Sequence, residues 1–251
     1  MKKIEINLQI NPKTYVKNPV TTDLGKKILE NSVILIDELG LEDFSFRKLA
    51  IRISSTESSL YRYFENKHYL FIYLLNWYWE WTSTRIDLKL INVDDPKEKL
   101  KLIIHTLIES SMKNADSPFI DEEILHRIIV REGTKAYHHK LVDTENEYGF
   151  FLSYKALCKR ISNVILELDK NHKYPKTLAS TMVETANNNL YFAKHLPRLT
   201  DISEAVDSKK MNNNLFEILY HLAISSLQNK SDEQGKKGVK INGRKLKLSN
   251  L

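Results

Sequence analysis

The sequence has little cysteine, glycine or proline, and it contains no long apolar run. Its single cysteine, Cys158, cannot form an internal disulfide and gives no sign of an oxidising compartment. The sequence contains no stretch of about 18 uncharged apolar residues, the length that a membrane-spanning helix needs. The N-terminus also lacks the apolar core and small-residue cleavage site of a secretory signal. These absences predict a cytoplasmic protein that does not contact a membrane.

The net charge of +6 is weak evidence for a nucleic-acid partner, because the excess of basic residues lies at the C-terminal end of the sequence. Residues 236–251 hold six Lys and Arg and no Asp or Glu, so they account for the whole excess. Composition alone therefore does not establish DNA binding. We predict a basic, solvated and flexible tail over 231–251, with a salt-sensitive contribution to DNA affinity as the alternative.

The chain does contain many segments in which apolar residues recur three and four positions apart, the spacing of amphipathic helices. It is therefore predicted to be all-α. Side chains able to cap a helix stand at Ser45, Thr56, Asn66 and Asp95. The helices expected are 23–39, with Gly40 as the left-handed residue after its end, 46–53, 57–63, 67–90, one from 96, one opening at Ser117-Pro118, and about 145–170, 176–195 and 208–228.

Residues 45–67, SFRKLAIRISSTESSLYRYFENK, combine two short helices with a tight turn between them. Ala50 is small where one helix must cross the other, and Ile53 and Leu60 can face each other across the bend. The other faces of the second helix carry polar residues that can project into a DNA major groove. The segment is thus predicted to be a helix-turn-helix.

This segment resembles the motif of the TetR family of transcriptional regulators. In that motif a Ser or Thr cap and a few variable residues precede Leu-Tyr-x-Tyr/His-Phe and a Lys. Here Thr56 is followed by Glu57-Ser58-Ser59, then by LYRYF at 60–64, and then by Lys67. The resemblance covers about 22–75. It implies an all-α fold in which a three-helix DNA-binding domain is joined by a long fourth helix to a larger regulatory and dimerisation domain.

On this basis the chain divides into a polar arm (1–21), a helix-turn-helix domain (22–67), a ligand-binding and dimerisation domain (68–230) and the tail (231–251). The resemblance implies that four residues contact DNA phosphates, namely Thr56, Tyr61, Tyr63 and Lys67. Arg62 and its neighbours are then expected to contact base edges. The full set of expected DNA-binding residues is Arg47, Thr56, Glu57, Ser58, Ser59, Tyr61, Arg62, Tyr63 and Lys67.

The turn departs from the family pattern. The family usually has Gly and an aliphatic residue just before the cap, whereas this chain has Ser54 and Ser55. Serine tolerates a left-handed backbone less well than glycine, at a cost of order 1 kcal/mol. The missing aliphatic side chain also weakens the packing between the two helices. We therefore expect a somewhat loosened motif, with weaker DNA binding but an unchanged fold.

Ligand-binding candidates are weaker than the DNA-binding set. Trp77 and Trp81 belong to an aromatic-rich fourth helix, where most such residues are expected to be core and some could line a pocket. Asn187 and Asn188 stand in the eighth helix at positions that favour apolar residues. They either face a polar pocket or the dimer seam, or lie on the solvent face.

The sequence gives little support for enzymatic or metal chemistry. Glu123 and His126 have the Glu-x-x-His spacing of di-iron bundles, but such a site needs a second copy, which is missing. Hydrolase, zincin and phosphate-loop motifs are also missing. We therefore expect no cofactor, no metal and no enzyme activity.

The leading hypothesis is a TetR-like regulator, acting as a repressor, that binds palindromic double-stranded operator DNA as a homodimer. Its dimer would form through the helices at 176–195 and 208–228, and a small molecule that the sequence does not name would modulate it. The alternative is a helical ligand-binding or protein-interaction module of the same fold with weak or no specific DNA binding.

Overall fold

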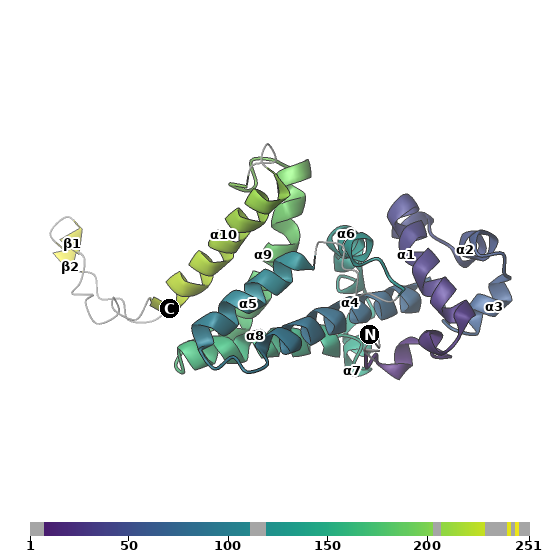
Figure 1. Ribbon diagram of the computed structural model, residues 1–251, viewed down its shortest axis with the longest axis horizontal. Helices are drawn as coiled ribbons and strands as arrows, with labels where there is room; N and C mark the ends of the chain where they lie inside the picture. Colours follow the sequence, from purple (N-terminus) through teal and green to yellow (C-terminus); the bar gives the residue numbers. More distant parts are fainter. Residues whose placement is uncertain (1–7, 111–118, 203–206, 229–239, 242–243, 246–251) are drawn as a thin grey trace.

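The computed structural model describes residues 8–110, 119–202, 207–228, 240–241 and 244–245, and it confirms an all-helical body (Figure 1). The α-helices are α1 (Asp23–Asp43), α2 (Phe46–Arg52), α3 (Glu57–Tyr61), α4 (Lys67–Leu90), α5 (Pro96–Glu109), α6 (Glu122–Glu132), α7 (Val142–Glu147), α8 (Leu152–Leu168), α9 (Pro175–His195) and α10 (Ser208–Gln228). Three 3-10 turns are η1 (Pro12–Thr14), η2 (Pro19–Thr21) and η3 (Gly133–Ala136).

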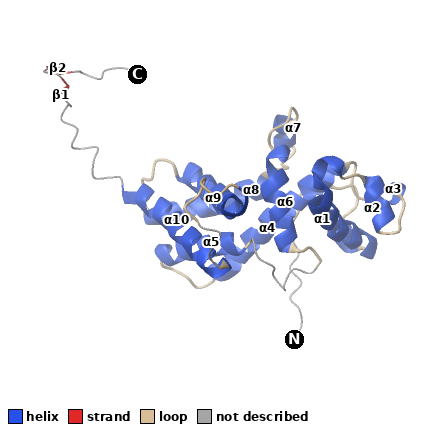
Figure 2. Cartoon of the chain, turned by 90° about the horizontal axis from the view of Figure 1, so that it is seen from above, coloured by secondary structure: helices blue, strands red, loops and turns tan. Residues whose placement is uncertain are grey.

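The helices form an elongated molecule with a small unit at one end. Figures 1 and 2 both place α1, α2 and α3 at that end and α5, α8, α9 and α10 at the other. The long helix α4 runs between the two groups, packing on α5 and α8, while α6 packs on α1. None of the described helices is long and apolar enough to cross a membrane.

The N-terminal arm is more ordered than the sequence suggested. Asn11 and Asn18 cap η1 and η2, and each turn has a proline at its start. The arm crosses α1 so closely that a Cβ on Gly25 would lie 2.1 Å from the carbonyl oxygen of Pro19. The amide of Val16 donates a 2.8 Å hydrogen bond to the carbonyl of Tyr63. From residue 8 onward the arm is therefore part of the small unit.

Helix α4 is buried over most of its length, because other helices cover it on several sides. Every residue from Leu70 to Trp79 is buried, and so are Trp81, Thr82, Ser83 and Ile86. This explains why its apolar residues are spread around the helix instead of forming one stripe. The helix is the shared core element of both ends of the molecule.

Most predicted boundaries hold, and three differ. Gly40 has the left-handed backbone expected of it, with a φ of +79°, and interrupts α1 there. Helix α1 does not end at this point, because one further turn follows to Asp43. The expected helix at 145–170 is two helices, α7 and α8, because Gly149 between them has a φ of +80°. Helix α6 begins at Glu122 with Asp121 as its cap.

The tail and the start of α6 are only partly described. Ser117 and Pro118, from which the sixth helix was predicted to open, lie outside the described residues. So does most of the tail at 231–251. Its described residues form an antiparallel pair of two-residue strands, β1 (Lys240–Ile241) and β2 (Arg244–Lys245).

Candidate nucleic-acid interface and effector cavity

The turn between α2 and α3 is closed by backbone hydrogen bonds. The amide of Ser55 donates to the carbonyl of Ala50 at 2.8 Å, and Ser54 has a φ of +52°. A left-handed residue of this kind commonly ends a helix, and glycine is the residue that adopts it without strain. Ser54 therefore stands where the family usually has glycine in a left-handed backbone, and the expected weakening of DNA binding stays a prediction.

Both short helices begin at the caps expected from the sequence. The hydroxyl of Ser45 accepts from the amide of Lys48 at 3.3 Å, and that of Thr56 accepts from the amide of Ser59 at 3.3 Å. The Thr56 hydroxyl also pairs with the Ser59 hydroxyl at 2.9 Å. These bonds satisfy amides that the first turn of a helix leaves free.

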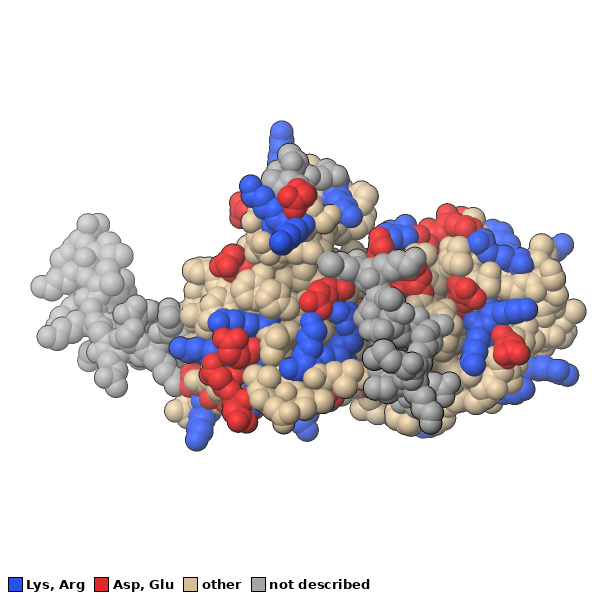
Figure 3. Space-filling view, viewed as in Figure 1, with Lys and Arg blue, Asp and Glu red and all other residues tan. Residues whose placement is uncertain are grey.

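The outer face of the helix-turn-helix is polar and exposed. Arg47 on α2 and Arg62 at the end of α3 are both exposed, and neither has a carboxylate partner among the described residues. Residues 45–67 carry five Lys and Arg against two Asp and Glu. Figure 3 shows basic side chains projecting from this end of the molecule. Glu57 and Ser58 are exposed beside them and Ser59 is half-buried.

The two tyrosines of the motif have different surroundings. Tyr61 is 51% exposed, and its ring is held edge-on against Phe46 at 5.0 Å. Tyr63 is only 4% exposed, and its hydroxyl is 2.7 Å from the hydroxyl of Thr22 at the start of α1. Because the Tyr63 hydroxyl already has a partner inside the fold, we reassign this residue from the phosphate-contacting set to the scaffold.

The assignment of Lys67 is corrected for a similar reason. Its ammonium donates to the carbonyls of Leu41, Glu42 and Phe44 at distances from 2.8 to 3.2 Å. An ammonium has three N–H donors, so none is left for a phosphate. The cation instead neutralises the carbonyl end of α1 and fixes the start of α4 to it.

A cavity of about 190 Å³ lies between α4, the α6–η3 segment and α9. Asn187 and Asn188 both line it, and Asn187 is only 6% exposed, which excludes the solvent-face alternative for that residue. Glu184 lines the same cavity and accepts a 2.7 Å hydrogen bond from the hydroxyl of Tyr154. The cavity thus offers a carboxylate and two amides beside aromatic and aliphatic walls.

The two tryptophans chosen from the sequence do not line this cavity. Trp77 and Trp81 are each 3% exposed, and their rings stack on one another with centroids 5.7 Å apart. They are buried core residues, so this cavity gives no support to the prediction that they contact a ligand. Trp79, two positions from each, lines the cavity and donates to the hydroxyl of Tyr137 at 3.1 Å.

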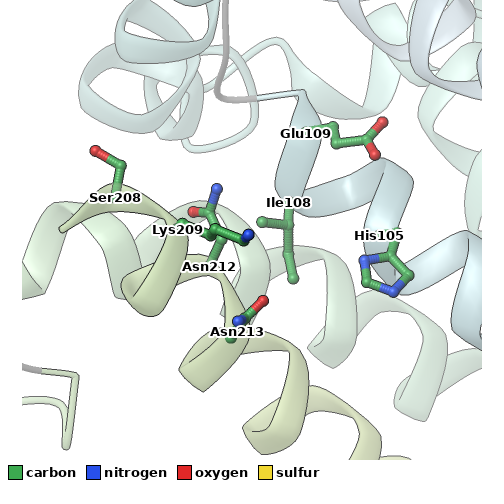
Figure 4. A pocket seen from close by; sticks show the side chains of 7 residues that line it. All are labelled: His105, Ile108, Glu109, Ser208, Lys209, Asn212 and Asn213. Atoms are coloured by element: carbon green, nitrogen blue, oxygen red, sulfur yellow. The ribbon is translucent and has the colours of Figure 1, made fainter.

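A second hollow, of about 400 Å³, lies between α5 and α10 (Figure 4). His105, Ile108 and Glu109 line it from α5, and Ser208, Lys209, Asn212 and Asn213 line it from α10. It is an open surface groove with polar walls. The cavity between α4 and α9 is the less open of the two and is the better candidate for a small-molecule site, because small ligands bind mainly in concave sites that bury them.

A buried polar contact lies close behind the cavity. The Tyr78 hydroxyl is 2.8 Å from Nδ1 of His126 and donates a longer bond, 3.5 Å, to Asn187. Burial lowers the pKa of His126 to about 4, with smaller contributions from Arg127 and Lys194. The imidazole is therefore neutral near pH 7. Arg85 donates to the buried Glu122 carboxylate at 2.7 Å.

Helix α6 connects the cavity to the helix-turn-helix end of the molecule. Ile129 and Val130 of α6 line the cavity, while Arg127 and Arg131 of the same helix donate to the carboxylate of Asp37 on α1. Sequence reasoning missed this connection, because Asp37 lies 90 and 94 residues from its two partners.

Comparison with known proteins identifies the fold. No protein-family model matches the chain, and no curated protein matches it. Many solved structures resemble it, and three of them illustrate the likeness. AibR, solved in complex with isovaleryl coenzyme A and operator DNA, is 14% identical with a TM-score of 0.56, covering 78% of this chain and 98% of AibR. The fatty acid degradation regulator FadR from Bacillus halodurans is 16% identical with a TM-score of 0.56, covering 80% and 95%. A TetR-family transcriptional regulator from Pectobacterium atrosepticum is 16% identical with a TM-score of 0.54, covering 84% and 98%.

Proposed function

We propose that this chain of TetR-like fold is a non-enzymatic transcriptional regulator that binds palindromic operator DNA as a homodimer and acts as a repressor in the cytoplasm. A small effector in the cavity between α4 and α9 would control it. The residue-level observation that carries the proposal is the exposed face of α2 and α3, where two unpaired guanidinium groups flank a capped short helix.

The DNA contacts we propose fall into two kinds. Arg47, Thr56 and Tyr61 contact phosphates, which set the position of the protein on the duplex. Glu57, Ser58, Ser59 and Arg62 face base edges, and Arg62 can bind a guanine with two parallel hydrogen bonds. The Ser59 hydroxyl already pairs with Thr56, so Ser59 and Thr56 act together.

The proposed dimer forms through α9 and α10. Helix α10 keeps apolar side chains half-buried within one chain, among them Ile218, Leu222 and Ile224. A second copy could cover these residues in a four-helix bundle. Such a dimer would hold two α3 helices about one turn of B-DNA apart, roughly 34–36 Å.

Effector control would run through α6. A ligand beside Ile129 and Val130 displaces the helix whose arginines hold Asp37 of α1. Since α1 packs on α2, and α2 on α3, a shift of α6 changes the position of the recognition helix. Two dimer arrangements with different affinities for effector and operator then give reciprocal control. At about 190 Å³, the cavity suits a ligand, or a part of one, smaller than most drugs.

The proposal is tested by measuring binding to a duplex carrying a selected site, by fluorescence anisotropy at several salt concentrations. Arg62→Ala should cost roughly 1–3 kcal/mol per half-site and relax the preference at one base position in each. Arg47→Ala should weaken binding to all sequences alike and lower the salt slope by about 1 per subunit. Lys97→Ala removes an exposed cation from α5 and is the matched control.

Loss of affinity for the two arginine variants with an unchanged control would support the interface. Wild-type binding that shows no sequence preference would favour the alternative, a TetR-like ligand-binding or interaction module. The strained Ser54 turn is the observation that favours this alternative.

A further inference from the structure

Three possible metal ligands from separate segments meet beside the first turn of α4. His68 is in α4, His139 follows η3, and Glu145 is in α7. Nε2 of His68 lies 2.7 Å from Oε1 of Glu145, and Nε2 of His139 lies 3.1 Å from Oε2. The three potential ligand atoms all fall within 4.8 Å of one another. His68 and Glu145 are 77 residues apart, so no local sequence motif predicts the cluster.

The carboxylate of Glu145 is the observation that points to a cation. Its side chain is only 6% exposed, yet Oε2 accepts no hydrogen bond from any described residue despite its closeness to His139. A buried carboxylate oxygen without a partner is costly, and most such groups are hydrogen-bonded or bound to a metal. A cation between the carboxylate and the two imidazoles would remove that cost.

We propose that His68, His139 and Glu145 bind a divalent transition metal of the Zn²⁺ class. Two imidazole nitrogens and one carboxylate oxygen form a donor set that suits Zn²⁺, which usually takes four ligands in a tetrahedron. The histidine side chains are 34% and 24% exposed, so solvent can reach the site and water can be the fourth ligand.

Metal binding would require a small separation of one pair of ligand atoms and a rotation of the His139 ring. With metal–ligand bonds of about 2.0–2.2 Å, the ligand atoms of a tetrahedral site lie about 3.3–3.6 Å apart. The His68–Glu145 pair must therefore open by less than about 1 Å from its 2.7 Å separation. Metal bonding also replaces the 3.1 Å contact of His139 Nε2 with the Ala136 carbonyl. Nδ1 of His139 accepts a 3.3 Å hydrogen bond from the Leu141 amide. When Nε2 binds metal, the ring proton must sit on Nδ1, which would then face another N–H donor. The ring must therefore turn. We therefore expect weaker affinity than at a structural zinc site.

Metal binding would regulate DNA binding, an inference that rests on the proposed function. His68 follows Lys67, whose ammonium holds the end of α1. His139 follows His138, which lines the effector cavity. A bound ion would thus join the start of α4 to the segment beside the cavity and restrict movement between the two ends of the molecule.

The site is tested on the untagged full chain, stripped with a chelator. Zn²⁺ binding is measured by calorimetry and by the shift in melting temperature, and Co²⁺ is added to record the absorption of its ligand field. Loss of an outer-shell partner typically costs 10–100-fold in affinity, so His68→Ala, His139→Asn and Glu145→Gln should each lose at least that much. His172→Ala is the matched control, since it removes a partly exposed histidine between α8 and α9 that lies outside the cluster and the cavity.

Stoichiometric Zn²⁺ binding, a tetrahedral Co²⁺ spectrum and loss of both in the three variants is the expected result. If the wild type binds no more Zn²⁺ than the Glu145→Gln variant, whose folding is checked by circular dichroism, the metal site is wrong. Operator affinity is then compared with and without Zn²⁺. Metal binding that leaves this affinity unchanged overturns the regulatory role alone, and absence of operator binding in both states overturns the proposed function and not the metal site.

Discussion

Arg131 of α6 donates a 2.5 Å hydrogen bond to the carboxylate of Asp37 on α1, and thereby joins the cavity-lining helix to the helix-turn-helix unit. Arg127, one turn earlier in α6, donates to the other carboxylate oxygen at 2.7 Å. This hydrogen bond also raises the pKa of the Arg127 guanidinium. A single carboxylate thus holds α1 against α6 at two points, as a coupling route between effector and operator requires.

Replacing Asp37 by Asn should loosen this junction without unfolding the protein. The three side chains are 20–45% exposed, so loss of the pairs should lower the free energy of unfolding by about 1 kcal/mol or less. We expect faster amide hydrogen exchange at 38–43, the end of α1, with little change in the core of α4. Glu123→Gln, which removes only the 3.3 Å pair with Arg127, is the control. Unchanged exchange in the Asp37 variant would contradict the assigned role.

Ser54→Gly should stabilise the protein. The left-handed φ of Ser54 strains a serine, and relief of that strain outweighs the extra freedom that glycine gives the unfolded chain. We expect a gain of about 0.5–1 kcal/mol, or roughly 1–4 °C in melting temperature. Ser55→Gly, next to it and without a positive φ, should give no gain. A lower melting temperature for the Ser54 variant would show that the turn is not strained.

The two tyrosines of the motif should respond in opposite ways to loss of the hydroxyl. Tyr63→Phe removes the 2.7 Å contact with Thr22 and should cost about 1 kcal/mol of stability, measured by urea unfolding. Tyr61→Phe leaves the packing on Phe46 intact and should weaken operator binding at unchanged stability. A large loss of operator affinity for Tyr63→Phe at full stability would restore this residue to the phosphate-contacting set.

Stability should fall as the pH drops from about 6.5 towards 4. The pKa of His126 is near 4 in the folded chain and near 6.5 in the unfolded chain, so between these values the unfolded state binds the extra proton. The contribution is fully present above pH 6.5, and a loss on the order of 3 kcal/mol follows from the full shift. His126→Asn, which keeps a polar partner for the Tyr78 hydroxyl, should flatten this pH dependence in urea titrations. An equal slope in both proteins would contradict the assignment.

The elements that were predictable from sequence are those with local signals. The caps at Ser45, Thr56, Asn66 and Asp95 fixed four helix starts within one residue. Long-range relations had no such signal. Nothing local to Lys67 shows that its ammonium meets carbonyls 23–26 residues earlier, and nothing in the α4 pattern tells Trp77 and Trp81 apart from Trp79.

Glycine and histidine positions illustrate the same limit. The break at Gly149 divides one predicted helix into α7 and α8, and this division brings Glu145 to His68. An unbroken amphipathic pattern across 145–170 concealed it. The metal cluster proposed above therefore depends on a turn that helical periodicity alone could not reveal.

The most direct test of the central claim is selection of bound sites from a random duplex DNA library by the wild-type protein at moderate salt. We predict enrichment of a palindrome whose half-sites lie about one helical turn apart, roughly 10 base pairs. Arg62→Ala should lose the preference at one position in each half-site. Recovery of no enriched sequence would contradict operator binding and leave the ligand-binding or interaction module as the function of this fold.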